Sequence, residues 1–103
     1  MKYVYPAIFR KANDIEDCYC IEFPDLEGVF TQGYGLFDAI YMAEDVLAFS
    51  LVLDEDDCKI IPKPTPIHQI KAEPDEYSTD AFVVLIKADT DNYRLLSAEW
   101  SLL

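Results

Sequence analysis

The sequence predicts an α+β domain: a three-stranded antiparallel meander, one main helix and a fourth strand, in the order β-β-β-α-β, with one helix layer on one sheet. Three observations support this prediction. Short segments rich in aromatic and β-branched residues come first, separated by polar turns. An apolar repeat of helical period follows, and a continuous apolar run near the C-terminus completes the pattern. A chain of 103 residues is long enough for one domain, residues 1–103.

The first three strands are predicted over residues 3–10, 18–23 and 29–32. The connections between them are short and contain residues typical of turns, among them Asn13, Pro24 and Gly28. Short connections favour antiparallel pairing of neighbouring strands. Pro6 has no N–H to donate to a neighbouring strand, so we expect it at a sheet edge, at a bulge or at an outward-pointing position.

The main helix is predicted from residue 36 to about residue 53, after a strand break at Gly33-Tyr34-Gly35. Its apolar stripe recurs with helical spacing and consists of Leu36, Ile40, Ala43, Leu47 and Leu51. Larger residues flank the stripe, so more than one surface could contact the helix: Phe37, Tyr41, Val46 and Phe49. The four acidic residues 54–57 oppose the helix dipole at its C-terminus, so we expect the helix to stop or fray there.

The chain after the helix is predicted to be extended over residues 60–66, because three of these residues are proline. Thr65-Pro66 could cap a short turn that ends at Gln69. Residues 81–88 form the last predicted strand, which is apolar on both faces as in a central strand covered on both sides. If this strand lies beside the first, the helix would connect two parallel neighbours. A last short turn is predicted over residues 93–100.

One helix covers only one face of a sheet, but the first and last predicted strands are apolar on both faces. Monomers rarely expose a contiguous apolar patch larger than a few hundred Å². The second face could be covered by a second copy of the chain, by a partner protein, or by a C-terminal segment containing Leu95, Leu96, Trp100 and Leu102. We expect a homo-oligomer, either a dimer or a tetramer.

The net charge of −12, from 20 acidic and 8 basic residues, opposes binding to nucleic acid and to anionic lipid. No segment approaches the roughly 20 apolar residues of a membrane span, and no signal peptide is evident at the N-terminus. Three cysteines without a disulfide spacing fit a reducing compartment. We therefore expect a cytoplasmic protein without direct contact to nucleic acid or membrane, for which a basic partner would relieve charge repulsion.

The sequence contains residues for two kinds of metal site. Zinc would require Cys18, Cys20, Cys58 and His68, whose spacing differs from that of zinc-binding turns. Mg²⁺ for nuclease chemistry would require convergence of Glu22, Asp25, Glu27 and Asp38. The eight basic residues are too scattered for a nucleic-acid groove, and no nucleotide-binding or metalloprotease motif is present. We predict no enzyme activity, no metal and no cofactor. A metal-dependent nuclease is an alternative that alanine at Glu22 and Asp25 would test.

Several segments, in order along residues 3–94, together resemble the HicB family of antitoxins. The most specific is Phe23-Pro24-Asp25-Leu26-Glu27-Gly28 followed by Thr31-Gln32-Gly33 and an amphipathic helix. Weaker matches are Tyr5-Pro6-Ala7-Ile8-Phe9, Ile61-Pro62-Lys63-Pro64-Thr65 and the segment from Phe82 to Asp89 with Tyr93-Arg94. Glu27 and Val29 stand where the family commonly has Pro and Cys. Gly35 replaces the usual Thr or Ser N-cap, which weakens the helix start by a few tenths of a kcal/mol.

This resemblance implies a reduced ribonuclease-H-like sheet without that enzyme's active site. It also implies the antitoxin of a type II toxin–antitoxin pair, a ribonuclease inhibitor that binds and masks HicA, a small basic mRNA-cleaving toxin. The alternative is an orphan HicB-like oligomerising or structural module of phage origin, with no toxin partner. Many family members continue into a DNA-binding domain. This sequence ends at Leu103, so we expect a single HicB-like domain without operator binding.

Affinity for a toxin would need buried apolar anchors as well as charge. The candidate anchors are Tyr34, Phe37 and Tyr41. The candidate acidic rim around them consists of Asp14, Glu16, Asp17, Asp25 and Glu27. The alternative interpretation places Phe37 and Tyr41 in the core and treats the acidic residues as a solvated surface.

Overall fold

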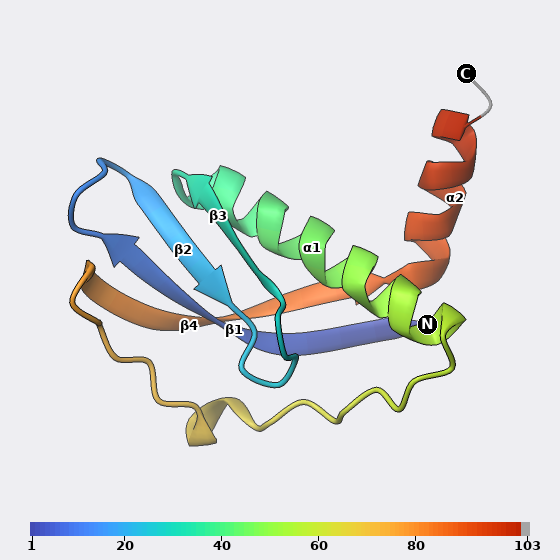
Figure 1. Ribbon diagram of the computed structural model, residues 1–103, viewed down its shortest axis with the longest axis horizontal. Coiled ribbons are helices and arrows are strands. Elements are labelled where there is room, and N and C mark those ends of the chain that lie inside the picture. The colour runs from blue at the N-terminus through green and yellow to red at the C-terminus, as the bar shows by residue number, and fades with distance from the viewer. Residues whose placement is uncertain (102–103) are drawn as a thin grey trace.

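The computed structural model describes residues 1–101, with side chains as far as Leu96, and contains one four-stranded antiparallel sheet of order β3-β2-β1-β4 (Figure 1). The predicted α+β class and the β-β-β-α-β order are confirmed, and a second helix takes the place of the predicted last turn. The elements are β1 (Lys2–Ala12), β2 (Cys18–Glu22), β3 (Phe30–Tyr34), α1 (Leu36–Asp56), the 3₁₀ helix η1 (Ile67–Gln69), β4 (Ser78–Asp89) and α2 (Thr90–Ser101).

The predicted parallel crossover is wrong, because the chain crosses the length of the sheet twice between β3 and β4. Helix α1 crosses once, and residues 57–77, the return segment, run back to the end of β1 (Figure 1). There the Asn13 N–H donates a hydrogen bond to the Tyr77 carbonyl at 2.9 Å. Strand β4 therefore starts beside the end of β1 and pairs with it antiparallel, with Tyr5 opposite Ile86.

Strand β4 lies at an edge of the sheet, so the prediction of a central strand covered on both faces is also wrong. Its inner face is apolar because Ile86 is buried in the core and Phe82 packs against the core. On its outer face Leu85 is 54% exposed. An apolar run shows that a strand is partly buried, but it does not reveal how many neighbours the strand has.

The core lies between α1 and the inner face of the sheet, where Leu47 and Leu51 are fully buried with Tyr5, Phe9 and Ile21. The predicted stripe is confirmed for its last three members. Its first two members, Leu36 and Ile40, are partly exposed. The flanking residue Val46 packs against the core, but Phe37, Tyr41 and Phe49 do not belong to it.

The start of α1 is held by backbone and carboxylate contacts. Gly35 is the N-cap, with φ +82° and no side-chain cap. The Asp38 carboxylate reaches back to accept a hydrogen bond at 2.9 Å from the N–H of Tyr34, the residue before the N-cap. Strand β3 continues to Tyr34, two residues beyond its predicted end, because Gly33 and Tyr34 still pair with β2.

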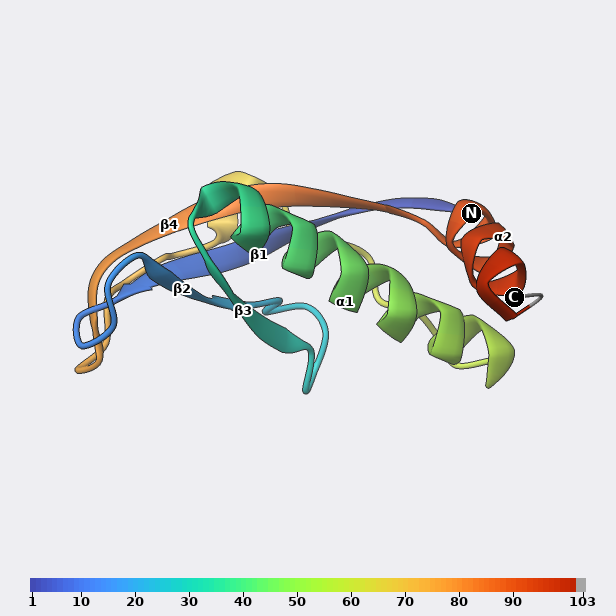
Figure 2. The same ribbon diagram turned by 90° about the horizontal axis from the view of Figure 1, so that it is seen from above.

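The return segment begins on the α1 side of the sheet, where Ile61 packs against the core and the Pro62 carbonyl accepts a hydrogen bond from the Tyr5 hydroxyl. From η1 onward it lies on the opposite face (Figure 2). Pro6 and Ile8 are buried on this face, and the neighbouring Arg10 Nε donates to the Glu73 carbonyl at 2.9 Å. Helix α2 packs against α1, and Leu95 and Leu96 are exposed, so these two residues do not cover the second face. Trp100 and Leu102, which were also predicted as possible cover for this face, lie outside the residues whose side chains the structure describes.

Pro6 is in a central strand, but β2 begins to pair with β1 only at Ile8. At Pro6 the sole neighbour of β1 is therefore β4, so the proline has the local surroundings of an edge position. Across residues 1–101, no helix has both the length and the apolar composition that a membrane span requires.

Candidate partner-binding surface

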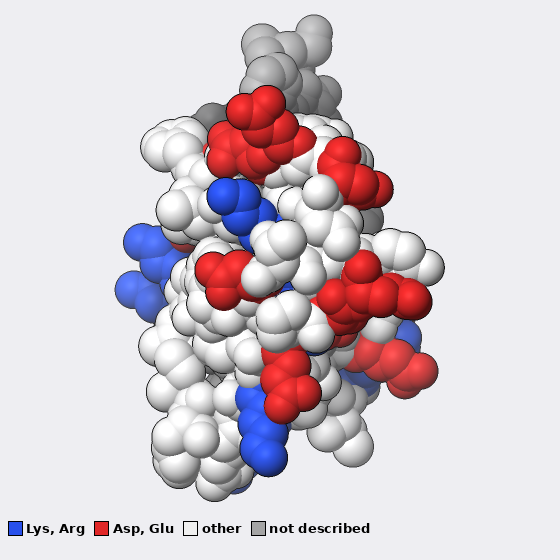
Figure 3. All heavy atoms as spheres, turned by 90° about the vertical axis from the view of Figure 1, so that its left-hand side faces the viewer, with Lys and Arg blue, Asp and Glu red and all other residues white. Residues whose placement is uncertain are grey.

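The predicted anchor Tyr34 and three of the predicted rim residues lie at one end of the sheet. Asp14, Glu16 and Asp17 are exposed in the β1–β2 turn, and Tyr34 ends β3. The Gly35 N–H donates to the Asp17 carbonyl at 2.8 Å, so this turn contacts the start of α1. Figure 3 shows acidic side chains spread over this end of the molecule, with uncharged surface and several basic side chains between them.

The other two rim residues lie at the opposite end of the β2–β3 hairpin. Glu27 is exposed there. Asp25 accepts hydrogen bonds from the Thr65 hydroxyl and, at 2.9 Å, from the Thr65 N–H. Asp25 thus ties the return segment to the hairpin, and the Thr65 hydroxyl predicted to cap η1 is used in this contact. The eight predicted residues therefore do not form one continuous patch.

Phe37 and Tyr41 lie one helical turn apart on α1 and are 89% and 61% exposed. This exposure overturns the alternative in which both rings belong to the core. Large aromatic side chains that remain in water on a helix are typical anchors for a partner, because their burial on binding releases much apolar area.

Tyr41 also lines a groove of about 900 Å³ between α1, α2 and the adjoining ends of β1 and β4. We call it the α1–α2 groove. Its wall includes three tyrosine rings and three carboxylates: Tyr3, Tyr41, Tyr93, Glu44, Asp45 and Asp89. Of these, only Tyr41 was among the predicted site residues.

A charge signal could have indicated this groove. Residues 36–56 contain no Lys or Arg, and their acidic residues are Asp38, Glu44, Asp45, Asp54, Glu55 and Asp56. No local sequence pattern, by contrast, predicts that α2 and its residue Tyr93 pack beside α1. Helix α2 follows β4 and is therefore far from α1 along the chain.

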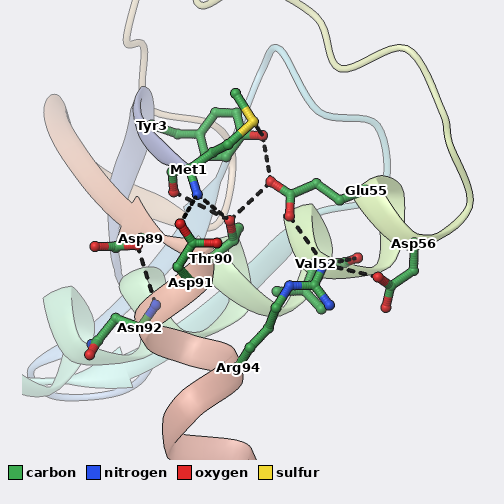
Figure 4. Close-up of polar contacts among 10 residues, drawn as sticks. All are labelled: Met1, Tyr3, Val52, Glu55, Asp56, Asp89, Thr90, Asp91, Asn92 and Arg94. Carbon is green, nitrogen blue, oxygen red and sulfur yellow. Dashed lines mark hydrogen bonds and ion pairs between the residues drawn. The ribbon is translucent and has the colours of Figure 1, made fainter.

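A polar cluster around Glu55 sets the position of α2 (Figure 4). The Glu55 carboxylate accepts hydrogen bonds from the Tyr3 hydroxyl at 2.6 Å and from the Thr90 hydroxyl at 2.9 Å. The Arg94 guanidinium lies 3.1 Å from Glu55 and 2.9 Å from Asp56. Helix α1 was expected to stop or fray at this acidic run. It continues to Asp56, and two of the acidic residues find partners on β1 and α2.

The cluster shifts the ionisation of its members. Burial, reinforced by the hydrogen bond to Glu55, raises the pKa of Tyr3 to about 12. The Tyr3 hydroxyl is in turn the main cause that lowers the pKa of Glu55, with further hydrogen bonds from Arg94 and Thr90. Burial raises the pKa of Tyr93 in the groove, and nearby Asp45 adds to this shift.

We expect this cluster to make folding stability sensitive to acid. The pKa of Glu55 is lower in the folded chain than its ordinary 4.5, so its contribution is present above that value and lost as the pH falls through the folded pKa. Glu55→Gln should lower the free energy of unfolding at pH 7 by about 1–3 kcal/mol and flatten its decline between pH 7 and pH 3. Urea unfolding at several pH values measures both. Glu16→Gln, at an exposed site, is the control, and parallel declines for wild type and Glu55→Gln would contradict the expectation.

The three cysteines that a zinc site would require differ in their surroundings: Cys18 is buried, whereas Cys20 and Cys58 are exposed. Burial raises the pKa of the Cys18 thiol. Within the described part of the chain, no three His, Cys, Asp or Glu residues are grouped so that they could hold a metal ion.

Comparison with known proteins gives a family match over nearly the whole chain. A family model described as the HicB-like antitoxin of bacterial toxin–antitoxin systems matches residues 5–98. An uncharacterised 14.9 kDa protein from the rep–hol intergenic region of Haemophilus phage HP1 is 31% identical over 86 residues. That alignment covers 84% of this chain and 61% of the phage protein, so this chain spans less than two thirds of its relative.

Two solved structures share the fold. A chain of a toxin–antitoxin complex from Streptococcus pneumoniae superposes with a TM-score of 0.77 at 22% identity, over 90% of this chain and 73% of that one. A chain of the HicA3 and HicB3 toxin–antitoxin complex superposes with a TM-score of 0.61 at 20% identity, over 84% of this chain and 99% of that one.

Proposed function

Since the chain belongs to the HicB-like antitoxin family of bacterial toxin–antitoxin systems, we propose that it is an antitoxin that binds and masks a small basic ribonuclease of the HicA type. The observation that carries the proposal is the pair of exposed rings, Phe37 and Tyr41, on a helix without a basic residue. Aromatic anchors supply affinity when they are buried, and the acidic surface steers a basic partner toward them.

In this proposal the chain acts by covering the surface of the toxin and catalyses no reaction itself. Acidic side chains would compete with RNA phosphates for the basic surface of the toxin, and the aromatic rings would hold the complex together. The protein would act in the cytoplasm, as a dimer or tetramer, without binding nucleic acid directly. The acidic rim beside Tyr34 and Phe37 would consist of Asp14, Glu16 and Asp17. Only a large partner would also contact Asp25 and Glu27, at the other end of the β2–β3 hairpin.

Co-expression with the small basic reading frame nearest the gene tests this proposal. We expect rescue of growth and a complex that survives purification at about 0.15 M and at 1 M salt, because charge attraction alone is screened within about 3 Å at 1 M. Phe37→Ala with Tyr41→Ala should weaken the complex by roughly 1000-fold, since each ring is expected to contribute about 2 kcal/mol.

The control is Phe49→Ala. Phe49 is also an exposed ring of α1, at 51%, but lies on a different side of the helix, so its removal should leave the complex intact. A folded chain that neither rescues growth nor forms a complex would contradict the proposal for that pair.

The phage relative favours a second candidate function, an orphan HicB-like module that oligomerises or has a structural role without a toxin. The same co-expression separates the two. A stable oligomer of this chain, with no complex and no rescue, is the result expected for the orphan module.

A further inference from the structure

We propose that the α1–α2 groove receives an arginine side chain of the basic partner, held by the rings of Tyr41 and Tyr93 and the carboxylates of Glu44 and Asp45. This inference rests on the proposed function and names the chemical group that one part of the surface recognises. All four residues line the same groove, and three of them lie within two turns of α1.

Arginine fits this combination better than lysine does. Its planar guanidinium can stack on an aromatic ring and at the same time donate paired hydrogen bonds to a carboxylate. Tyr41 and Asp45 are exposed and adjacent on the helix surface, four residues apart, so a planar cation can contact both. Tyr93 is partly buried and packs against the core, so its ring forms a fixed wall opposite.

The charges around the groove favour a cation on the helix side. Arg94, the basic residue of α2 among the described side chains, is already paired with Glu55 and Asp56. Lys2 and Lys87 also line the groove, but they lie on the strand side, where Asp89 is paired directly with Lys2 across β1 and β4. A second copy of this chain is a poor occupant of the groove, because both of its arginines, Arg10 and Arg94, are already paired with carboxylates.

The groove is formed before any partner binds, because the cluster around Glu55 holds α2 against α1. Thr90, the first residue of α2, is fully buried, and its N–H donates a hydrogen bond to the Met1 carbonyl at 2.9 Å. A preformed site avoids the cost of ordering its walls on binding, so even a single guanidinium should bind measurably.

Titration of the full chain with acetyl-arginine amide, followed by ¹H–¹⁵N NMR, tests the proposal without a toxin. We expect shifts concentrated in residues 41–48 and 88–96, smaller shifts with acetyl-lysine amide, and none with the uncharged citrulline analogue. Tyr41→Ala or Asp45→Asn should raise Kd by about fivefold or more. Lys87→Gln, which removes a repelling charge, should lower Kd.

The matched control is Asp80→Asn, which removes the same charge at an exposed site near the other end of β4 and should leave Kd unchanged. Equal shifts with arginine and citrulline, or shifts spread over all acidic regions, would overturn the proposal. Groove shifts that depend on protein concentration alone would also overturn it, in favour of a second copy. If the chain rescues growth but acetyl-arginine amide shifts no NMR signals of the groove, this inference is refuted and the antitoxin function still stands.

Discussion

Replacing Gly33 with alanine is expected to destabilise the chain by about 2–4 kcal/mol, since the new methyl group has no room. A Cβ atom at Gly33 would lie 2.5 Å from the Ala39 Cα and 2.7 Å from the Ala39 nitrogen, both of them backbone atoms of α1. Backbone atoms cannot move aside as a flexible side chain can, so α1 would have to shift from β3. Urea unfolding followed by far-UV circular dichroism measures the loss.

Gly28→Ala separates this steric effect from backbone strain. Gly28 has φ +76°, a conformation that costs alanine about 1–2 kcal/mol, but no atom lies within 4 Å of its added Cβ. We therefore expect a smaller loss at Gly28 than at Gly33, and no displacement of α1. A Gly33→Ala protein as stable as wild type would show that β3 and α1 are not in close contact.

Replacing Leu47 with alanine is expected to cost about 3 kcal/mol, because Leu47 is fully buried and its truncation leaves a cavity between α1 and the sheet. For a domain of this size, a loss of each kcal/mol lowers Tm by roughly 4–8 °C. Thermal and urea unfolding should agree on the loss.

Leu53→Ala makes the same chemical change on the same helix, at a side chain that is 47% exposed. It should cost less than about 1 kcal/mol, because less apolar area is lost and water fills the space. Equal losses at Leu47 and Leu53 would contradict the orientation of α1 on the sheet. Far-UV circular dichroism of each folded variant confirms that the helix itself is kept.

The candidate surface was only partly predictable. Phe37 and Tyr41 stand out in the sequence because they widen the helix stripe, and the structure leaves both exposed. Glu44, Asp45 and Tyr93 were missed. Their grouping depends on the packing of α2 against α1, which is held by the contacts of Glu55 with Thr90 and Arg94.

The sequence by itself determined the strands, the main helix, the α+β class and the family. Each depends on a local pattern: alternation within about five residues, a stripe of helical period, or the Phe23 to Gly33 motif. The Gly33 of that motif has a physical reason in the structure, since only glycine permits the approach of β3 to Ala39.

Only the tertiary structure decided the direction of β4, its edge position, the cover of the second sheet face and the groove. All four follow from the path of the return segment, residues 57–77, and from contacts it makes possible. This segment has no repeating pattern, so the sequence does not show which way it runs. Its course is set by long-range contacts such as Asp25 with Thr65 and Arg10 with Glu73, which form only when the whole chain is folded.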